Sequence, residues 1–291
     1  MILKWGNPPA SVLNAPVYLA RAKGMLTLPE VEIVPIDTAS GNAHTRALLN
    51  GEFDMGHIGA PPLMSALSRT REYALVGTGL LRHPPHSMLV PAEVNQLSEI
   101  VNQPIGINRR GTCSHSILRT LLARERINES HLQLVEMGSG AEGLSLIRRG
   151  ELSGAVLWEP FTTTALREMG WKIFSAGRAI WFPPRYCTMI YARRSLAERS
   201  PELVRRVLRA YASWVQAAQL DLDSAAEHVV ERMPGIPPED IRSAIAREAP
   251  TWRSDTNLDL GLISRAIAEL EVQAVLTENF SLDDAIIRLG V

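Results

Sequence analysis

The chain has 291 residues, of which 46% are hydrophobic, and a formal net charge of -1 at pH 7. This length allows one large domain or two medium ones with a real core, and the near-neutral charge argues against a nucleic-acid or anionic-membrane binder. Two cysteines, Cys113 and Cys187, are too few for a disulfide scaffold and show no spacing typical of a metal site. We therefore expect a monomer that binds a small molecule, without nucleic acid, metal or cofactor.

The location of the protein depends on its natural start. No window reaches the roughly eighteen apolar residues of a membrane span, and residues 1–6 predict a strand rather than a secretory signal. If Met1 is the true start, we expect a cytoplasmic protein. If an export peptide has been removed, we expect a periplasmic one.

The first 82 residues alternate between short apolar runs and helical patterns. Strands are predicted at residues 2–5, 31–36, 54–58 and 73–78, and helices at residues 16–23, 42–49 and 62–68. This alternation indicates βαβ units around a largely parallel sheet.

A second set of the same kind follows. Its strands are predicted at 105–108, 132–135, 154–158 and 172–175, and its helices at 114–124, 142–149 and 161–169. Adjacent prolines at 84–85 and 183–184 cannot lie inside a helix, so the segments 83–91 and 187–191 are interpreted as two crossings between lobes. Helices at 201–220, 224–233, 238–248, 257–275 and 282–289 form a tail that we expect to pack on the first lobe.

This pattern predicts an α/β fold with two lobes, each a mostly parallel sheet flanked by helices. Lobe 1 would contain residues 1–84 and 190–291, and lobe 2 residues 85–189. The hinges would lie near 82–91 and 183–191.

One architectural unit occurs twice, in residues 51–61 and 150–160. Each copy begins with Gly-Glu, continues as a short strand and ends in a proline that opens a helix. In open α/β sheets, ligands bind at the carboxyl ends of the strands. Two facing copies therefore predict a small molecule held between two lobes.

Four segments resemble one known family. Residues 16–26 (PVYLARAKGML) are similar to its first helix, and residues 48–59 to its Gly-x-x-Asp segment. Residues 105–122 resemble the opening of its second lobe, and residues 158–161 (WEPF) its Trp-Glu-Pro-Phe turn. The family is that of the class II periplasmic substrate-binding proteins, in the branch that serves nitrate, sulfonates, taurine and thiamine-pyrimidine precursors. The resemblance covers roughly residues 1–220, and motifs in family order are more specific than single motifs.

The resemblance implies a solute-binding protein of an ABC-type importer. Two lobes would close about a two-strand hinge on a small organic molecule that is sulfonate-, carboxylate- or pyrimidine-like. A membrane permease would be its partner.

Trp5 and Asn7 lie where the first predicted strand closes, and they face the cleft if the carboxyl-end rule holds. An indole offers a flat apolar face, and an amide offers both a donor and an acceptor. The alternative is that Trp5 is a core residue and Asn7 a turn residue. The sequence leaves both interpretations open.

Two helix starts carry small residues, Ala60-Pro61 and Thr112-Cys113-Ser114. An anion could approach the backbone N–H groups and the positive end of the helix dipole there. The alternative is that both are routine helix starts.

Arg82, in the first crossing, could pair with a carboxylate or sulfonate in bidentate fashion. His83 and His86 are three residues apart, but no further metal ligands can be identified. We interpret these histidines as surface residues of the hinge.

Trp158 and Glu159 end the second copy of the repeated unit. A carboxylate beside an indole suits a cationic or hydrogen-bond-donating ligand, such as an aminopyrimidine, and conflicts with an anion. Alternatively, Glu159 lies in the first turn of a helix, where negative charge is favoured anyway.

A rival interpretation is a cytosolic enzyme on the same scaffold, of the desulfinase, decarboxylase or lyase type. Cys113 at a helix start would have its thiolate favoured by the dipole, and a nearby histidine could act as its base. His115 is only two residues away and does not face Cys113, so His57 or His44 of the opposite lobe fits this role better. The alternative for Cys113 is an ordinary buried thiol. A cytosolic metabolite sensor also fits.

Overall fold

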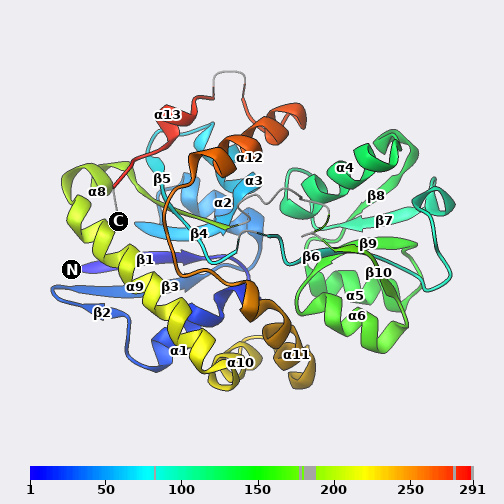
Figure 1. Cartoon of the computed structure of the whole chain (residues 1–291), viewed down its shortest axis with the longest axis horizontal. Helices are drawn as coiled ribbons and strands as arrows, with labels where there is room; N and C mark the ends of the chain where they lie inside the picture. The colour runs from blue at the N-terminus through cyan, green and yellow to red at the C-terminus, as the bar shows by residue number, and fades with distance from the viewer. Residues whose placement is uncertain (82, 177–178, 180–187, 278–279, 290–291) are drawn as a thin grey trace.

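The computed structural model describes residues 1–81, 83–176, 179, 188–277 and 280–289. In this part of the chain the strands form two sheets, one of six strands and one of five, which lie beside each other in Figure 1. We call the unit around the six-stranded sheet lobe 1 and the other lobe 2. The predicted two-lobed α/β fold is confirmed.

Lobe 1 takes its strands from two distant parts of the chain, in the order β2-β3-β1-β4-β11-β5. Their bounds are β1 (Ile2–Asn7), β2 (Thr27–Leu28), β3 (Val31–Asp37), β4 (Met55–Gly59), β5 (Tyr73–Thr78) and β11 (Thr188–Arg193). β1 is parallel to β3 and β4, whereas β11 is antiparallel to both of its neighbours, β4 and β5. The returning chain is thus inserted between strands formed by the first part of the sequence.

Lobe 2 has the strand order β10-β6-β9-β7-β8. Their bounds are β6 (His86–Val90), β7 (Pro104–Ile107), β8 (Gln133–Glu136), β9 (Gly154–Trp158) and β10 (Lys172–Ala176). β7 is parallel to β8 and β9, but β6 is antiparallel to β9 and β10. The prediction of mostly parallel sheets was therefore too simple. Both sheets are mixed, because the crossing segments enter them as the antiparallel strands β6 and β11.

The same helix start precedes each copy of the repeated unit. The helices of the two lobes are α1 (Ala15–Ala22), α2 (Gly41–Leu49), α3 (Ala60–Leu67), α4 (Cys113–Glu125), α5 (Gly140–Arg148) and α6 (Phe161–Met169), with 3-10 turns η1 (Val12–Asn14), η2 (Leu97–Ile100) and η3 (Glu129–His131). The Oγ atoms of Ser40 and Ser139 accept hydrogen bonds from the amides of Ala43 and Glu142, each at 3.1 Å. These serines are N-caps, which explains why α2 and α5 begin at equivalent places.

The C-terminal part is helical, as the sequence predicted. It contains α8 (Arg194–Arg199), α9 (Pro201–Leu220), α10 (Leu222–Val230), α11 (Pro238–Glu248), η4 (Ala249–Thr251), α12 (Leu260–Val272) and α13 (Leu282–Ala285). No helix of the described residues has both the length and the apolar character needed to cross a membrane. α13 is shorter than predicted, because Ile286 leaves the helix and bridges to Leu75 of β5. α8 and β2 were not predicted.

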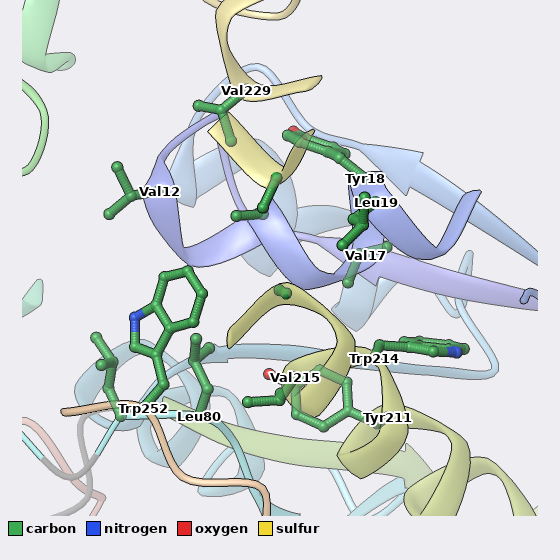
Figure 2. Close-up of a cluster of buried hydrophobic side chains, with 14 of the residues drawn as sticks. Val12, Val17, Tyr18, Leu19, Leu80, Tyr211, Trp214, Val215, Val229 and Trp252 are labelled. Atoms are coloured by element: carbon green, nitrogen blue, oxygen red, sulfur yellow. The ribbon is translucent and has the colours of Figure 1, made fainter. Parts of the chain in front are cut away.

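The largest core cluster joins the two lobes. Around α1, α9 and α10 it contains the rings of Tyr18, Tyr211, Trp214 and Trp252, which Figure 2 shows packed with aliphatic side chains. The same cluster continues into lobe 2 through side chains of α5, β9 and α6. The lobes are therefore held together by apolar packing on this side.

Two glycines of lobe 1 make room for a tyrosine hydroxyl. The Tyr191 side chain of β11 lies against Gly6 and Gly56, and a Cβ atom at either glycine would collide with its oxygen. Tyr191 is fully buried and its hydroxyl contacts His44 Nε2 at 2.9 Å. The close approach of β1, β4 and β11 thus requires these two glycines.

The proposed residue boundaries of the lobes stay a prediction. Of the predicted hinges, residues 82 and 183–187 lie outside the described residues, and so does Cys187. The remaining hinge residues contribute mainly to β6 and β11.

Candidate ligand-binding cleft

A cleft of about 500 Å³ lies between the lobes. Lobe 1 contributes the loop after β1, the first turn of α2 and the end of β4, and lobe 2 contributes the start of β6 and the first turn of α4. The segment that follows α12, Gln273 to Val275, lines it as well. The cleft thus lies at the carboxyl ends of β1, β4 and β7, and Trp158 lines it at the end of β9. β4 and β9 are the strands of the repeated unit.

The lining of this cleft is cationic. Arg69, Arg110 and Arg119 line it, and among the described residues no aspartate or glutamate does. Burial lowers the pKa of His86 to about 3 and also lowers the pKa of His115, so both rings are neutral at pH 7. The positive charge therefore comes from the arginines.

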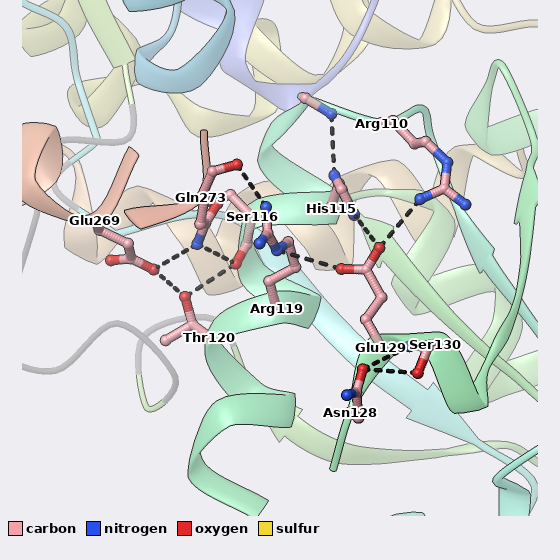
Figure 3. Close-up of polar contacts among 11 residues, drawn as sticks. Arg110, His115, Ser116, Arg119, Thr120, Asn128, Glu129, Ser130, Glu269 and Gln273 are labelled. Carbon is pink, nitrogen blue, oxygen red and sulfur yellow. Dashed lines mark hydrogen bonds and ion pairs between the residues drawn. The ribbon is translucent and has the colours of Figure 1, made fainter. Parts of the chain in front are cut away.

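Glu129 holds Arg110, Arg119 and His115 in place on the lobe 2 side of the cleft, as Figure 3 shows. Its carboxylate accepts from Arg110 Nη1 at 3.1 Å and pairs with Arg119 Nε at 3.2 Å. The amide of Gly111 donates to His115 Nδ1 at 3.1 Å, so the neutral ring carries its proton on Nε2, which faces Glu129 Oε1 at 3.2 Å. Both nitrogens of His115 are therefore engaged.

The first turn of α4 brings backbone donors to the cleft. Its residues Cys113, Ser114 and His115 line the cleft, and the first amides of an α-helix have no intrahelical partner. Thr112 Oγ1 donates to the Arg109 carbonyl at 2.6 Å, and Ser114 Oγ accepts from the Asn108 amide at 2.8 Å. These two side chains shape the turn that presents the amides.

The start of α3 is poorer in donors than predicted. The helix begins at Ala60, so Pro61 and Pro62 occupy its first turn, and neither has an N–H group. Ala60 and Pro61 are both buried, and the lining residues are their neighbours Ile58, Gly59 and Pro62. The two predicted helix starts are thus not equivalent.

Trp5 does not face the cleft, and the prediction that it stacks on a ligand was wrong. Its ring is fully buried in lobe 1 and stacks on Tyr211 with a centroid distance of 5.5 Å. Trp214 packs edge-on against it. The alternative, a core residue, is what the structure shows, because α9 covers this face of the sheet.

Asn7 is fully buried as well. Its Nδ2 donates to Asp37 Oδ1 at 2.9 Å, and its carbonyl accepts from Thr38 Oγ1 and His44 Nδ1. It lies next to Pro8 of the cleft lining but does not itself line it. Asn7 therefore joins β1 to β3 and α2.

Glu159 also points away from the cleft, which overturns its interpretation as a partner for a cationic ligand. Its Oε1 accepts from Arg247 Nη1 at 2.7 Å, and its Oε2 accepts from Thr163 Oγ1 at 2.6 Å. The side chain is 4% exposed. Trp158, the neighbouring residue, does line the cleft, with its ring 5.6 Å from that of His86.

The catalytic alternative is not supported by the geometry. Cys113 lines the cleft but is only 9% exposed, and no histidine of the described chain is hydrogen-bonded to it. His57 is fully buried and accepts from Trp5 Nε1 at 3.3 Å, and His115 is engaged on both nitrogens. His44 is fully buried too, between the Asn7 carbonyl and the Tyr191 hydroxyl. None of the predicted bases is therefore hydrogen-bonded to Cys113. Within the described residues, no cluster of three or more His, Cys, Asp or Glu could hold a metal.

Several lining residues were not predicted. His86, interpreted from the sequence as a surface residue of the hinge, lines the cleft. The predicted residue Arg82 lies outside the described residues. Asn42 follows the Ser40-Gly41 helix start, a signal that the sequence offered. With its amide oxygen turned toward lobe 2, Asn42 accepts from Arg109 Nη1 at 3.0 Å. Arg69 and Gln273 gave no sequence signal, since tertiary folding alone brings them to the cleft.

Most of the chain matches the model of a known protein family. The model of the NMT1-like family matches residues 10–233, which is more than half of the chain. The chain belongs to the NMT1-like family. The family resemblance predicted from the sequence motifs is confirmed.

Solved structures share the fold of this NMT1-like protein. The alkanesulfonate-binding protein SsuA from Xanthomonas axonopodis pv. citri, bound to MOPS, matches with a TM-score of 0.84 and 17% identity, covering 99% of this chain and 98% of that one. The periplasmic aliphatic sulphonate binding protein SsuA from Escherichia coli matches with a TM-score of 0.83 and 17% identity, covering 99% and 92%. The ligand-binding component of an ABC-type import system from Staphylococcus aureus, with zinc bound, has a TM-score of 0.81 and 16% identity, covering 99% and 97%. No curated protein matches the NMT1-like chain by sequence.

Proposed function

We propose that this protein is the solute-binding component of an ABC-type importer and that it binds a small organic anion between its lobes. The observation that carries the proposal is the charge of the cleft. Among the described residues, three arginines and no carboxylate line it. The proposal also implies a periplasmic location and a permease partner.

The charge balance favours one negative group. Arg110 and Arg119 are paired with Glu129, and Arg110 also lies 3.9 Å from Glu136. Arg69 has no ion-pair partner in the described part of the chain, and it extends from the end of α3 into the lining. An anion in the cleft would therefore compensate the charge of Arg69, which no described carboxylate pairs.

The backbone adds to this attraction. The first turn of α4 presents amides and the positive end of a helix of 13 residues. Glu159, the carboxylate that suggested a cationic ligand, is held by Arg247 outside the cleft. The position of Glu159 supports an anion rather than a cation as the ligand.

The names of the structural neighbours are consistent with this ligand class. Two of them are sulfonate-binding proteins, and a sulfonate is an organic anion. Hinge closure would enclose such a ligand between the lobes. Polar contacts between the lobes, such as the hydrogen bond from Arg119 Nη1 to the Gln273 carbonyl at 2.6 Å, would stabilise the closed state. Closure of two lobes on a ligand needs no catalysis.

Calorimetric titration tests the proposal. The purified protein is titrated with sulfonates and carboxylates, and with amines and aminopyrimidines of similar size. We expect the anions alone to bind and to raise the midpoint of thermal unfolding. Binding confined to amines or aminopyrimidines would contradict the proposal, and conversion of a bound anion to product would favour the enzyme instead.

Arg69→Gln tests the unpaired charge. A charge-assisted hydrogen bond contributes about 1.5–3 kcal/mol, so the variant should lose about tenfold to a hundredfold in anion affinity. Arg199→Gln is the matched control, since Arg199 is an exposed arginine far from the cleft lining. Equal affinities of the two variants would remove Arg69 from the site.

A further inference from the structure

A second cavity adjoins the main cleft. It has a volume of about 230 Å³ and lies between the start of α5 and the loop that joins α10 to α11. Four residues line both cavities, namely Pro9, Gly41, Asn108 and Trp158. The two cavities are therefore compartments of one interlobe space, and we call the smaller one the side compartment.

The floor of the side compartment is apolar. Phe161, Met233 and Ile236 line it, and each is only 6% exposed. Trp158 forms a wall between the two compartments, and Phe161 holds its ring edge-on at a centroid distance of 5.5 Å and an angle of 79°. Such a surface is stabilised by contact with an apolar group rather than with water.

Of the four polar side chains in the described lining of the side compartment, those of Ser40, Ser139 and Arg232 are already engaged, and the fourth is Asn108. Arg232, its one arginine in the described lining, donates to Asp37 Oδ2 at 2.7 Å and lies over the ring of Tyr18. Ser40 and Ser139 serve as the N-caps of α2 and α5. The described lining contains no carboxylate. The side compartment therefore differs from the main cleft, where Arg69 has no ion-pair partner among the described residues.

Small residues keep the side compartment open. Gly140 is obligatory, because a Cβ atom there would collide with the ring of Phe161. Ala39 of lobe 1 and Ala141 of lobe 2 line it from opposite sides and are both exposed. A larger side chain at either alanine would fill the space without entering the core.

The volume indicates the size of the group that fits. An apolar cavity of about 150 Å³ accepts benzene. The side compartment, at about 230 Å³, is larger. It has room for a substituted ring or for an alkyl chain of comparable size.

We propose that the side compartment is an apolar subsite, which takes the hydrophobic body of an organic anion whose charged group lies in the main cleft. This inference rests on the proposed function and names the ligand class more closely: an anion with an alkyl or aryl body rather than a small inorganic one. Trp158 is the shared wall along which the ligand passes from one compartment to the other.

Titration with a homologous series tests the subsite. Methanesulfonate, butanesulfonate and hexanesulfonate carry the same charged group and differ only in apolar length, and benzenesulfonate adds a ring. We expect affinity to rise about threefold to fourfold for each added methylene, until the side compartment is full.

Ala141→Phe and Ala39→Phe fill the side compartment from the two lobes. In each variant the ratio of hexanesulfonate to methanesulfonate affinity should fall about tenfold or more, the equivalent of roughly two buried methylenes. Ala92→Phe is the control, since Ala92 is an exposed alanine of lobe 2 that does not line either compartment. A thermal unfolding midpoint close to that of the wild type shows that each variant is folded.

The outcomes separate the two proposals. Equal affinities along the series, or an affinity ratio that both filling variants leave unchanged, would overturn the subsite while the anion-binding function stands. If no member of the series and no carboxylate binds, the proposed function fails and the subsite with it.

Discussion

The buried histidines of lobe 1 have well-defined protonation states. His44 Nδ1 donates to the Asn7 carbonyl at 3.0 Å, so Nε2 must accept from the Tyr191 hydroxyl at 2.9 Å. His57 accepts from Trp5 on Nδ1, and its Nε2 has no hydrogen-bond partner in the described part of the chain. Burial lowers the pKa of His44 to about 4 and that of His57 to about 3. Both are neutral in the folded protein at pH 7.

These histidines predict acid sensitivity. Their pKa values in the folded state lie below the value of about 6.5 in the unfolded chain, so the unfolded state binds more protons below that pH. The free energy of unfolding should decrease from about pH 6.5 down to about pH 4, by up to about 1.4 kcal/mol per pH unit for each histidine. Glu159 acts in the opposite sense, since burial raises the pKa of its carboxyl.

Urea unfolding measured between pH 4.5 and 7.5 checks this prediction. His57→Gln should flatten the profile, because the glutamine does not titrate. A wild-type free energy that stays constant over this range would show that the histidines are accessible to protons in the folded state.

Single residues are also where sequence reasoning failed. Trp5 and Trp158 each end a strand near a predicted ligand site, yet Trp5 is fully buried by α9, and Trp158 lines the cleft. The difference arises from Tyr211 and Trp214, which lie some two hundred residues further along the chain. Local pattern contains no information on such a contact. For the same reason the turn of Glu159 toward Arg247 could not be foreseen.

Several elements whose ends are marked by glycine or proline were predicted well. β5, β9, α6, α9 and α11 have the predicted bounds. The repeated unit correctly indicated strands that end at one interlobe cleft. It did not show that Pro61 and Pro62 remove donors from α3 while α4 keeps them, although the residues themselves were visible.

Gly56→Ala tests the packing of β4 against β11. The added Cβ atom would collide with the Tyr191 hydroxyl and with the Gly6 carbonyl, which is backbone and cannot move aside. We expect the free energy of unfolding to fall by at least about 1–3 kcal/mol, the usual range for overpacking. Denaturant unfolding measures this change. Gly41→Ala serves as the comparison, since no atom lies near its Cβ position, and an equal loss there would contradict the steric explanation.

The two lobes are joined differently on their two sides. Beside α11 the lobes share one apolar core cluster and the pair between Glu159 and Arg247. Beside α12 the contacts are polar: Arg119 donates to the Gln273 carbonyl, and Gln273 Nε2 donates to the Ser116 carbonyl at 3.3 Å. Figure 3 shows this second contact region, which also includes Thr120 and Glu269.

Arg247→Ala tests the first of these contact regions. The substitution leaves the carboxylate of Glu159 buried without its cationic partner. We expect the free energy of unfolding to fall by about 3 kcal/mol at pH 7, the low end for a broken buried pair, because Arg247 itself is 44% exposed. Part of the loss should be recovered at acid pH, because burial raises the pKa of the Glu159 carboxyl and its protonation removes the unpaired charge. Denaturant unfolding at the two pH values measures both effects. Arg199→Ala should leave the free energy nearly unchanged, and a similar loss in both variants would contradict a role for the pair.

The polar character of the α4–α12 contact has a thermodynamic consequence. Separation of these two helices would expose hydrogen-bonding groups that water satisfies, and little apolar surface. The open and closed states of the empty protein would then differ only slightly in free energy and hardly at all in heat capacity. A ligand of ordinary affinity is sufficient to shift such an equilibrium, and any large negative heat-capacity change on binding would come from the ligand's own apolar body entering the side compartment.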